Sequence, residues 1–397
     1  MNNKYNYGTA ENTAFLNEQR ENLFEFGRNF PAPTGSSYYL WDDGTPAKDR
    51  PRETWITSRM VHVYSLALLS GHTWAAELVD AGLKGLSGEL KDEAHGGWYA
   101  GVYADGTPMP GKACYAHAFV ILAASSALQA GRPGAKELLD EALAVYDRYF
   151  WDEEAGLAVD GWDTDFTVPD DYRGINSNMH TVEAFLAVAD VTGDEKYRTR
   201  AGRIIGHVRE WAARNSYRLP EHFSADWRVL KEYNSDKKDD PFKPYGATPG
   251  HGIEWARLML QWGGADCLAD AENLYNRAME DGWCADGGRG LVYTTDWDGK
   301  PVVHDRMHWT LAEAINTSSI LWRMTGKEKY AEDYSALMRY LDEVVIDYKN
   351  GSWFHQLDKD GNVLTTVWPG KSDLYHAVQS MIIPYEDDVR VSVIKAF

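Results

Sequence analysis

The chain repeats one pattern along most of its length. Segments rich in apolar and small residues recur six times, and the first five end at glycines that lie 60, 62, 70 and 63 residues apart. Glycine suits the end of a helix, because the residue after the last turn commonly adopts a left-handed conformation that costs glycine nothing. The repeat therefore predicts six helices of one kind. Their expected ranges are residues 54–71, 112–131, 176–193, 249–263, 306–326 and 371–384.

Charged stretches with apolar residues at helical spacing separate these segments. Residues 135–149, 196–211 and 327–345 are examples, and residues 13–30 supply a first one before the repeat begins. A helix that is apolar nearly all round belongs in an interior, whereas a helix with one apolar face covers that interior. We therefore predict an all-α fold, an (α/α)6 barrel whose six helical hairpins form an inner and an outer ring, as one domain over residues 1–397. The alternative is an open α-solenoid, whose units are usually shorter, at roughly 34 to 47 residues.

Polar residues cluster at the start of each apolar segment. In a barrel of helical hairpins the amino ends of the inner helices share one mouth, so these side chains can converge on one ligand. A lone histidine such as His117 or His308 is more often structural, but burying a ring of polar groups is costly, which favours a wet pocket. The candidates include Arg59, Tyr115, His117, Asn176, Asn178, His180, His251, Glu254, His308, Trp309, Glu313, Asp373, His376 and Gln379.

The residue types at these positions leave two kinds of chemistry open. His251 and Glu254 are three residues apart and share a helix face, so the carboxylate could orient the imidazole or bind a ligand hydroxyl. Histidine titrates near neutral pH, as proton-transfer catalysis requires, and two facing histidines would suggest proton abstraction next to a carbonyl. Two facing carboxylates would favour glycoside cleavage instead. Such a pair could come from Glu183, Glu254, Glu313 and Asp373.

Composition excludes several classes of partner. The formal charge of −20 argues against nucleic acid, whose phosphates need a basic surface, and the 13% aromatic content in an acidic chain suits sugars. No stretch approaches the roughly 20 apolar residues of a membrane span, and the amino terminus has no apolar signal region. Three scattered cysteines are too few for a disulfide framework and point to the cytoplasm.

The sequence also gives no reason to expect a metal or a cofactor. His304 and His308 have the spacing of a zinc-protease motif, but Asp305 stands where that motif needs glutamate, and no clear third ligand follows. The glycines of residues 286–290 lack the order of a dinucleotide-binding loop. We therefore predict no metal site and no cofactor.

Four short segments together resemble a known family. They are Asn176-Ser-Asn-Met-His180, Pro249-Gly-His251-Gly-Ile-Glu254-Trp, Trp309-Thr-Leu-Ala-Glu313-Ala and Lys371-Ser-Asp-Leu-Tyr-His376-Ala. With them the chain resembles the N-acylglucosamine 2-epimerase superfamily over about residues 54–379. The likeness is closest to its aldose–ketose isomerase branch, which contains mannose isomerases and sulfoquinovose isomerases.

The resemblance implies a fold, a chemistry and a set of site residues. It implies an (α/α)6 barrel that uses neither metal nor redox cofactor and works by histidine acid/base chemistry on an opened sugar. By this likeness His251 and His376 are the catalytic pair. The implied substrate-binding residues are Arg59, Tyr115, Asn176, His180, Glu254, Trp309 and Glu313.

The resemblance also implies a reaction. The expected one interconverts D-mannose and D-fructose, with lyxose and xylulose as related sugars. In it His180 or His251 helps to open the ring, and His376 takes the C2 proton to give a cis-enediol. Sulfoquinovose is an alternative substrate, because Arg59 and Lys243 or Lys371 could meet a sulfonate. A sugar 2-epimerase and, more distantly, an (α/α)6 glycoside hydrolase are the alternative activities, and the oligomeric state is left open.

Overall fold

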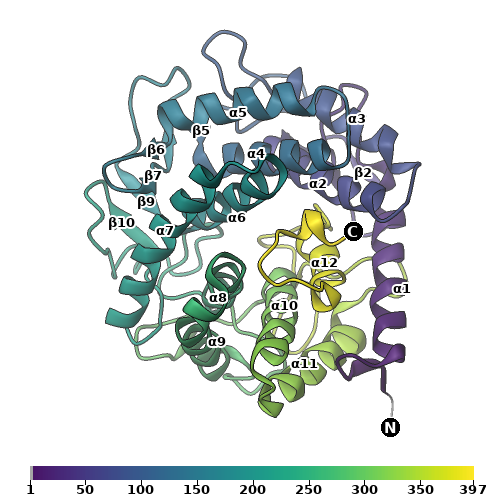
Figure 1. Ribbon diagram of the computed structural model, residues 1–397, viewed down its shortest axis with the longest axis vertical. Helices are drawn as coiled ribbons and strands as arrows, with labels where there is room; N and C mark the ends of the chain where they lie inside the picture. The colour runs from purple at the N-terminus through teal and green to yellow at the C-terminus, as the bar shows by residue number, and fades with distance from the viewer. Residues whose placement is uncertain (1–2) are drawn as a thin grey trace.

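Twelve α-helices form two concentric rings in the computed structural model, which describes residues 3–397 (Figure 1). The inner ring consists of α2 (Thr54–Leu69), α4 (Cys114–Gln129), α6 (Ile175–Thr192), α8 (Pro249–Gly263), α10 (His308–Thr325) and α12 (Tyr375–Ser380). The outer ring consists of α1 (Ala10–Phe26), α3 (Ala75–Ser87), α5 (Ala135–Tyr149), α7 (Glu195–Arg214), α9 (Leu268–Gly282) and α11 (Glu328–Tyr340). Each inner helix contacts the next, and α12 contacts both α10 and α2, so the ring closes. The predicted (α/α)6 barrel is confirmed, and the open solenoid is excluded.

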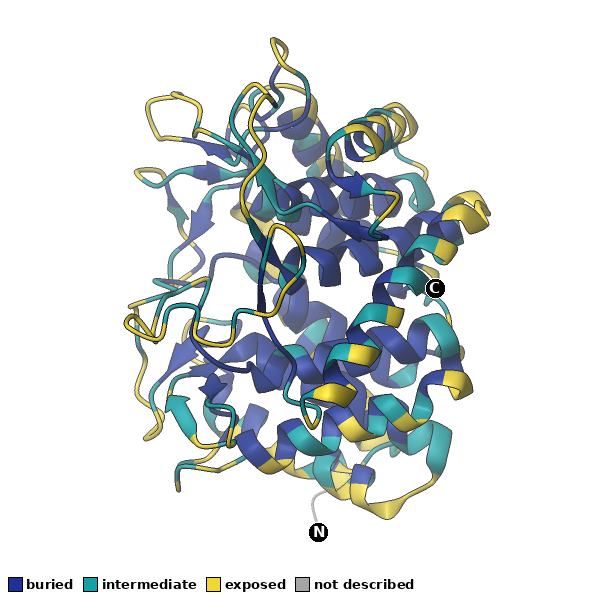
Figure 2. Ribbon diagram, turned by 90° about the vertical axis from the view of Figure 1, so that its left-hand side faces the viewer, coloured by how far each residue is buried: buried dark blue, intermediate teal, exposed yellow. Residues whose placement is uncertain are grey.

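Burial explains which helices lie inside. Every residue of α4 from Ala116 to Ala127 is buried, so this helix is surrounded on all sides by protein. On α5 only one stripe is buried, formed by Leu138, Leu139, Ala142 and Tyr146 together with the first residue, and the opposite face is charged. Figure 2 shows the same contrast across the molecule, with buried inner helices and outer helices exposed along one side.

The ends of the helices agree with the sequence pattern, with three exceptions. Gly193 and Gly326 end α6 and α10 in left-handed conformations, at φ 74° and 65°. Gly263, however, keeps φ −114° inside the end of α8, and the left-handed residue is the next one, Gly264. The first outer helix begins before residue 13, because the Thr9 hydroxyl accepts a hydrogen bond from the Asn12 amide and caps it.

The sixth repeat is the third exception, because its inner helix is short. α12 has six residues, and the segment before it has no regular secondary structure, with Lys371 buried. The Asp373 carboxylate accepts a hydrogen bond from the amide of Tyr375 at 3.0 Å, which helps to start the helix at that residue. A 3-10 turn, η5 (Ile383–Tyr385), follows within three residues.

Short antiparallel strand pairs join the loops at one end of the barrel, on the left of Figure 2. Four strands stand directly before inner helices: β3 (Arg52–Glu53) before α2, β5 (Lys112–Ala113) before α4, β9 (Tyr172–Gly174) before α6 and β13 (Arg306–Met307) before α10. Their partners are β4 (Gly101–Val102), β8 (Gly161–Trp162), β10 (His222–Ser224) and β14 (Gln356–Leu357). Because each pair ties one loop to a later one, the starts of these inner helices are fixed relative to one another.

The remaining elements are short. The other strands are β1 (Tyr39–Leu40), β2 (Pro46–Ala47), β6 (Trp151–Asp152), β7 (Leu157–Ala158), β11 (Thr294–Thr295) and β12 (Pro301–Val303). The other turns are η1 (Asn3–Tyr5), η2 (Gly27–Asn29), η3 (Gly264–Cys267), η4 (Leu341–Val345) and η6 (Val393–Lys395). Within residues 3–397, none of the helices combines the length and the apolar character needed to cross a bilayer.

Two glycines in outer helices test how closely the rest of the protein packs on them. A Cβ on Gly85 of α3 would lie 2.5 Å from the backbone nitrogen of Ser36, whereas a Cβ on Gly206 of α7 would meet nothing within 4 Å. We expect Gly85→Ala to destabilise the protein by roughly 1–3 kcal/mol through overpacking. Gly206→Ala should stabilise it by about 0.5–1 kcal/mol, because alanine favours the helix. Thermal unfolding of both variants checks this, and a rise in Tm for Gly85→Ala would contradict the packing described here.

Candidate active site

A cavity of about 700 Å3 opens at the end of the barrel where the inner helices begin. Aromatic and titratable side chains from all six inner helices line it. Eight of the nine site residues expected from the sequence are among them: Arg59, Tyr115, Asn176, His180, His251, Glu254, Trp309 and His376. The ninth, Glu313, does not line the cavity but is fully buried behind His376. The structure thus brings all nine together, eight on the cavity wall and one beneath it.

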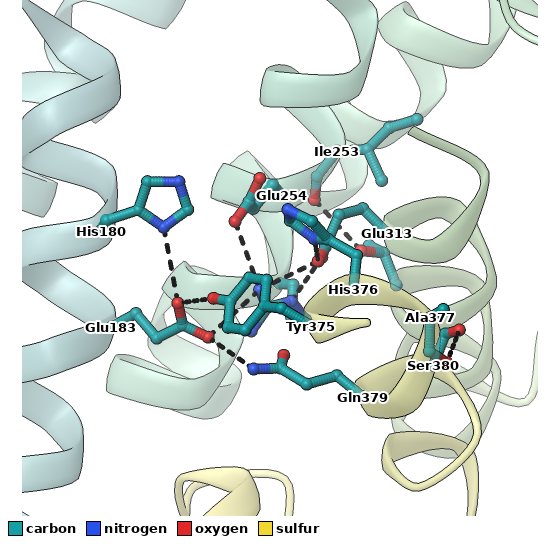
Figure 3. Close-up of polar contacts among 12 residues, drawn as sticks. His180, Glu183, Ile253, Glu254, Glu313, Tyr375, His376, Ala377, Gln379 and Ser380 are labelled. Atoms are coloured by element: carbon teal, nitrogen blue, oxygen red, sulfur yellow. Dashed lines mark hydrogen bonds and ion pairs between the residues drawn. The ribbon is translucent and has the colours of Figure 1, made fainter. Parts of the chain in front are cut away.

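His376 is held by a carboxylate behind it (Figure 3). Its Nδ1 lies 3.0 Å from Oε1 of Glu313. Burial, together with the positive charge of Arg59, holds the pKa of His376 well below its usual range, so the ring is neutral at pH 7. We assign the Nδ1 proton to the bond with Glu313, which leaves the lone pair on Nε2. His376 therefore has the form of an oriented base.

His251 has the same arrangement with a different acid. Its Nδ1 lies 3.0 Å from Oε2 of Glu221, the residue just before β10. The helical spacing left two roles open for Glu254, to orient His251 or to bind a ligand hydroxyl. The first is wrong, because Glu221 is the partner of His251, whereas Glu254 lies one turn further along α8 and approaches Arg257, at 3.5 Å. Glu221 reaches His251 because the pairing of β9 with β10 places it at the start of α6, where its carbonyl accepts a hydrogen bond from Ile175.

Trp309 lies beside both histidines. Its ring centroid is 5.0 Å from that of His251 and 5.8 Å from that of His376, with interplanar angles of 31° and 36°. A Cβ on Gly250 would come within 2.8 Å of the indole, so glycine is needed for Trp309 to pack this closely on α8. The two imidazoles and the indole thus form one aromatic wall.

Arg257 lies beneath the cavity among three glutamates. Its Nε donates to Oε2 of Glu313 at 2.6 Å, and its Nη2 lies 3.5 Å from Glu254 and 3.8 Å from Glu183. Glu183 also accepts hydrogen bonds from Tyr375 and from Gln379, on α12 (Figure 3). All of these side chains are buried. The network therefore ties α6, α8, α10 and α12 together at the centre of the barrel.

One guanidinium cannot balance three ionised carboxylates. Burial, and then the charge of Glu313, raises the pKa of Glu254 well above its usual range. Burial would also raise the pKa of Glu183, but the charge of Arg257 and the hydrogen bond from Tyr375 outweigh it and lower that pKa. Burial also raises the pKa of Glu313, but the charge of Arg257 and its hydrogen bond oppose that rise, so we assign the proton of this cluster to Glu254. As a carboxylic acid on the cavity wall, it can donate a hydrogen bond to a ligand oxygen.

Arg59 forms a second cationic point at the wall. Its Nη1 donates to Asp373 at 3.2 Å and its Nη2 donates to the Tyr115 hydroxyl at 2.8 Å. The guanidinium also packs against the rings of Phe119 and Tyr375, 4.5 and 4.7 Å from their centroids. Its Nε has no hydrogen-bond partner in the described part of the chain. This nitrogen is itself buried, so Arg59 meets the cavity through other atoms of its side chain.

His180 and Asn176 complete the set on α6. The His180 ring packs against Phe119 at 4.6 Å and Tyr115 at 5.0 Å, and burial lowers its pKa to about 4. Its Nδ1 lies 3.6 Å from Glu183, too far for a hydrogen bond. Within residues 3–397, Oδ1 of Asn176 has no hydrogen-bond partner. Both side chains therefore have polar capacity left for a ligand.

Residues 35–380 match the N-acylglucosamine 2-epimerase family. The chain belongs to this family. It is 43% identical to D-mannose isomerase of Thermobifida fusca, over 94% of each chain, and 41% identical to D-mannose isomerase of Pseudomonas cannabina pv. alisalensis, over 83% of this chain and 82% of that one. A crystal structure of a D-mannose isomerase superposes with a TM-score of 0.87 at 26% identity, over 94% of this chain and 97% of that one. The predicted family and the isomerase class of enzyme are confirmed.

Two other polar residues near the starts of inner helices, His117 and Asn178, bond only to the backbone among the described residues. This agrees with the expectation that a lone polar residue at such a position is more often structural. His117 accepts a hydrogen bond from the Trp98 amide at 3.1 Å, and its other ring nitrogen is 2.8 Å from the carbonyl of Ala113. Asn178 accepts from the Ala158 amide at 2.8 Å. His308 differs, because it lines the cavity while it stacks on His355 at 3.8 Å.

Lys371 does not reach the cavity, so the expectation that it could meet a sulfonate is wrong. Its ammonium donates to Asp347 at 2.7 Å and to the carbonyls of Asp42 and Gly351. The side chain is fully buried, and its positive charge is paired with Asp347 inside the protein. Lys243, the other candidate, does line the cavity and lies 3.8 Å above the Tyr172 ring.

Removing Arg257 should reveal the charge that it balances. We expect Arg257→Met to cost roughly 3–5 kcal/mol, because it leaves buried carboxylates without a counter-ion. Their pKa values in the folded variant then lie above the unfolded values, so this cost is small at low pH and grows as pH rises. Thermal unfolding from pH 5 to 8 should show a widening gap to wild type. Arg214→Met, an exposed control, should change Tm little at any pH; a gap for Arg257→Met that does not change with pH would contradict the assignment.

Proposed function

We propose that the protein interconverts D-mannose and D-fructose, and related sugars of the lyxose and xylulose type, by proton transfer between C2 and C1. The observation that carries this proposal is the pair His376 and His251. Each binds a carboxylate through Nδ1 and packs on Trp309 at the wall of one cavity. The named activity of the relatives from Thermobifida fusca and Pseudomonas cannabina supports the same reaction.

The reaction needs an open-chain sugar with a carbonyl at C1. Ring opening moves a proton from O1 to O5, and in this proposal His251 or His180 assists it. His376 Nε2 then removes the C2 proton, and the electron pair of that bond forms the C1–C2 double bond while O1 takes up a proton. Return of a proton to C1, with loss of the proton on O2, gives the ketose. Every atom and electron is accounted for without an external reactant.

Glu254 and Arg59 assist at the oxygens. A protonated Glu254 can donate to the oxygen on which charge develops, and the guanidinium of Arg59, which lines the cavity, supplies a second donor group. Preoriented donors of this kind often contribute the largest part of catalysis in such steps. Glu313, which the family likeness placed among the binding residues, acts in this proposal through His376 rather than on the sugar.

Glycoside cleavage fits the carboxylates less well. That chemistry needs two carboxyl groups on either side of a scissile bond within the cavity. Glu313 lies outside the cavity wall, and Arg257 engages both Glu313 and Glu254. A sugar 2-epimerase differs from the proposed isomerase only in where the proton returns, so it is the outcome to compare directly.

The proposed reaction uses neither metal nor cofactor. The groups suited to metal binding are His180, Glu183, Glu254, Glu313 and His376. The cation that these glutamates contact is Arg257. We also propose that the enzyme works in the cytoplasm, since its three cysteines are free.

Product analysis tests the proposed function. D-Mannose should give D-fructose in the presence of EDTA and without added metal or nucleotide. In D2O, deuterium should enter fructose at C1 if one base both takes and returns the proton with exchange from solvent. Conversion of mannose to glucose alone would move the protein to the epimerase class, and release of reducing ends from an oligosaccharide would make it a hydrolase.

The two histidines are tested by removing their ring chemistry. His376→Asn and His251→Asn should each lower kcat by about 10² to 10⁴, the loss expected for a general acid or base, with Tm near wild type. A structural role predicts the reverse, because loss of a packed, hydrogen-bonded ring reduces stability first. His117→Asn is the matched control, since His117 is hydrogen-bonded only within the protein, and it should lower Tm more than kcat. A catalytic-pair variant that keeps more than about a tenth of wild-type turnover contradicts the assigned role.

A further inference from the structure

The outer wall of the cavity holds a carboxylate that the proposed proton transfer does not use. Asp160 lies between β7 and β8 and lines the cavity. Its carbonyl accepts a hydrogen bond from the Cys114 amide at 2.8 Å, which fixes its backbone against the start of α4. Its Oδ1 accepts a hydrogen bond from the Ser177 hydroxyl, on the first turn of α6. Two inner helices therefore hold this side chain in place.

The second carboxylate oxygen is left for a ligand. A Cβ on Gly174 would come within 2.8 Å of Oδ2 of Asp160, so glycine at this position makes room for the carboxylate. The neighbouring Tyr172 hydroxyl is already engaged with His222 Nδ1, at 2.7 Å, and His222 donates its other ring proton to the Pro244 carbonyl. Within residues 3–397 no donor bonds Oδ2, and this oxygen keeps access to the cavity.

Two of the three cations that line the cavity in the described part of the chain are paired with acids other than Asp160. Among the cations of the cavity wall, Arg59 is paired with Asp373 and Lys112 with Asp92. Lys243 lies over the Tyr172 ring, close enough to Asp160 to affect its titration.

The acids beside Asp160 are engaged with the backbone. Asp163 accepts hydrogen bonds from the amides of Thr167 and Val168, and Asp170 accepts one from the Tyr172 amide. Asp170 is exposed and its Oδ2 has no hydrogen-bond partner among the described residues, whereas Asp160 is held by Ser177 and so combines a fixed position with a free oxygen.

The position of Asp160 indicates which part of a sugar it would meet. Ser177, its partner, lies at the start of α6, whereas His180 and Glu183 lie one and two turns deeper toward Arg257. The reacting C1 and C2 atoms belong beside His376 and Glu254, so the far end of the sugar lies toward the mouth. A carboxylate there accepts a hydrogen bond from a hydroxyl and repels an anion.

We propose that Asp160 binds a hydroxyl at the end of the sugar remote from C1 and makes the site selective for uncharged sugars over sugars that carry an anion at C6. This inference rests on the proposed function and extends it to substrate choice. Sulfoquinovose, the alternative substrate with a C6 sulfonate, would bring its charge toward Asp160. Burial raises the pKa of Asp160 to about 6, so the side chain is ionised at pH 8.

Asp160→Asn is the decisive variant, because it removes the charge and keeps the shape. At pH 8 we expect kcat/KM for D-mannose to fall about 10- to 100-fold, mainly through KM, as a charge-assisted hydrogen bond is lost. With Lys243 then unopposed, the preference for D-mannose over D-mannose 6-phosphate, and over sulfoquinovose, should fall at least about tenfold. An unchanged preference, or a loss of kcat with both kinds of sugar alike, would overturn the proposal.

Two further variants separate charge from position. Ser177→Ala leaves the charge of Asp160 but frees the carboxylate, so KM for D-mannose should rise while discrimination against the C6 anion stays close to wild type. Asp165→Asn removes an exposed carboxylate of the following loop that bonds only Thr167, and it should change neither quantity. A shift in preference with Asp165→Asn as large as that with Asp160→Asn would show a general charge effect and overturn the assignment.

Binding measurements test the role of Asp160 separately from the proposed isomerase activity. If wild-type protein does not convert D-mannose, the proposed reaction is wrong, but binding of D-mannose and D-mannose 6-phosphate can still be followed by tryptophan fluorescence. The role of Asp160 then stands if Asp160→Asn weakens binding of D-mannose and reduces the ratio of the affinities for D-mannose and D-mannose 6-phosphate. It falls if both affinities stay as in wild type.

Discussion

The site depends on one buried ion cluster, Arg257 with Glu183, Glu254 and Glu313. A buried arginine without partners would be very costly, and so would three carboxylates without a cation. The cluster therefore has to be built as a whole, from helices α6, α8 and α10. It orients His376 through Glu313, because the carboxylate that accepts the hydrogen bond from the imidazole is itself fixed by the guanidinium. It also keeps a proton on Glu254, so one cluster sets both the direction of a base and the charge of a possible acid.

Strand pairs in the loops fix the inner helices relative to one another at the mouth of the barrel, as the ion cluster does at its centre. Inner helices alone could slide or tilt against one another, but strand pairs just before α2, α4, α6 and α10 connect their first residues to other loops. Glu221 and Asp160 illustrate the consequence. Both stand outside the inner helices, and strand pairing holds their loops against the start of a neighbouring helix. Asp160 thereby lines the cavity, and Glu221 reaches His251.

Much of the architecture could be predicted because periodicity follows directly from burial. Segment 112–131 is apolar on every side, and the structure buries α4 on every side. The convergence of His251 and His376 followed from the shared mouth of the inner helices. Glu221 could not be found in this way, since a loop residue has no period and its distance from His251 depends on strand pairing. Arg257 was missed for another reason: it lies within an apolar helix segment, where its role depends on acids from other helices.

The charges around His376 favour one of two forms of the intermediate, a neutral enediol or an anionic enediolate. Arg59 is paired with Asp373, and Arg257 is shared among three glutamates, so the described residues around His376 leave no cation to offset a full negative charge on the sugar. A free enediolate would add its charge to an already acidic, buried setting, where electrostatic repulsion is strong. A neutral cis-enediol avoids that cost, provided that a proton reaches O1 as the C2 proton leaves. The protonated Glu254 and the Arg59 guanidinium at the cavity wall are donors suited to this purpose. The burial and negative charge that would destabilise an anionic intermediate thus also keep the proton on Glu254.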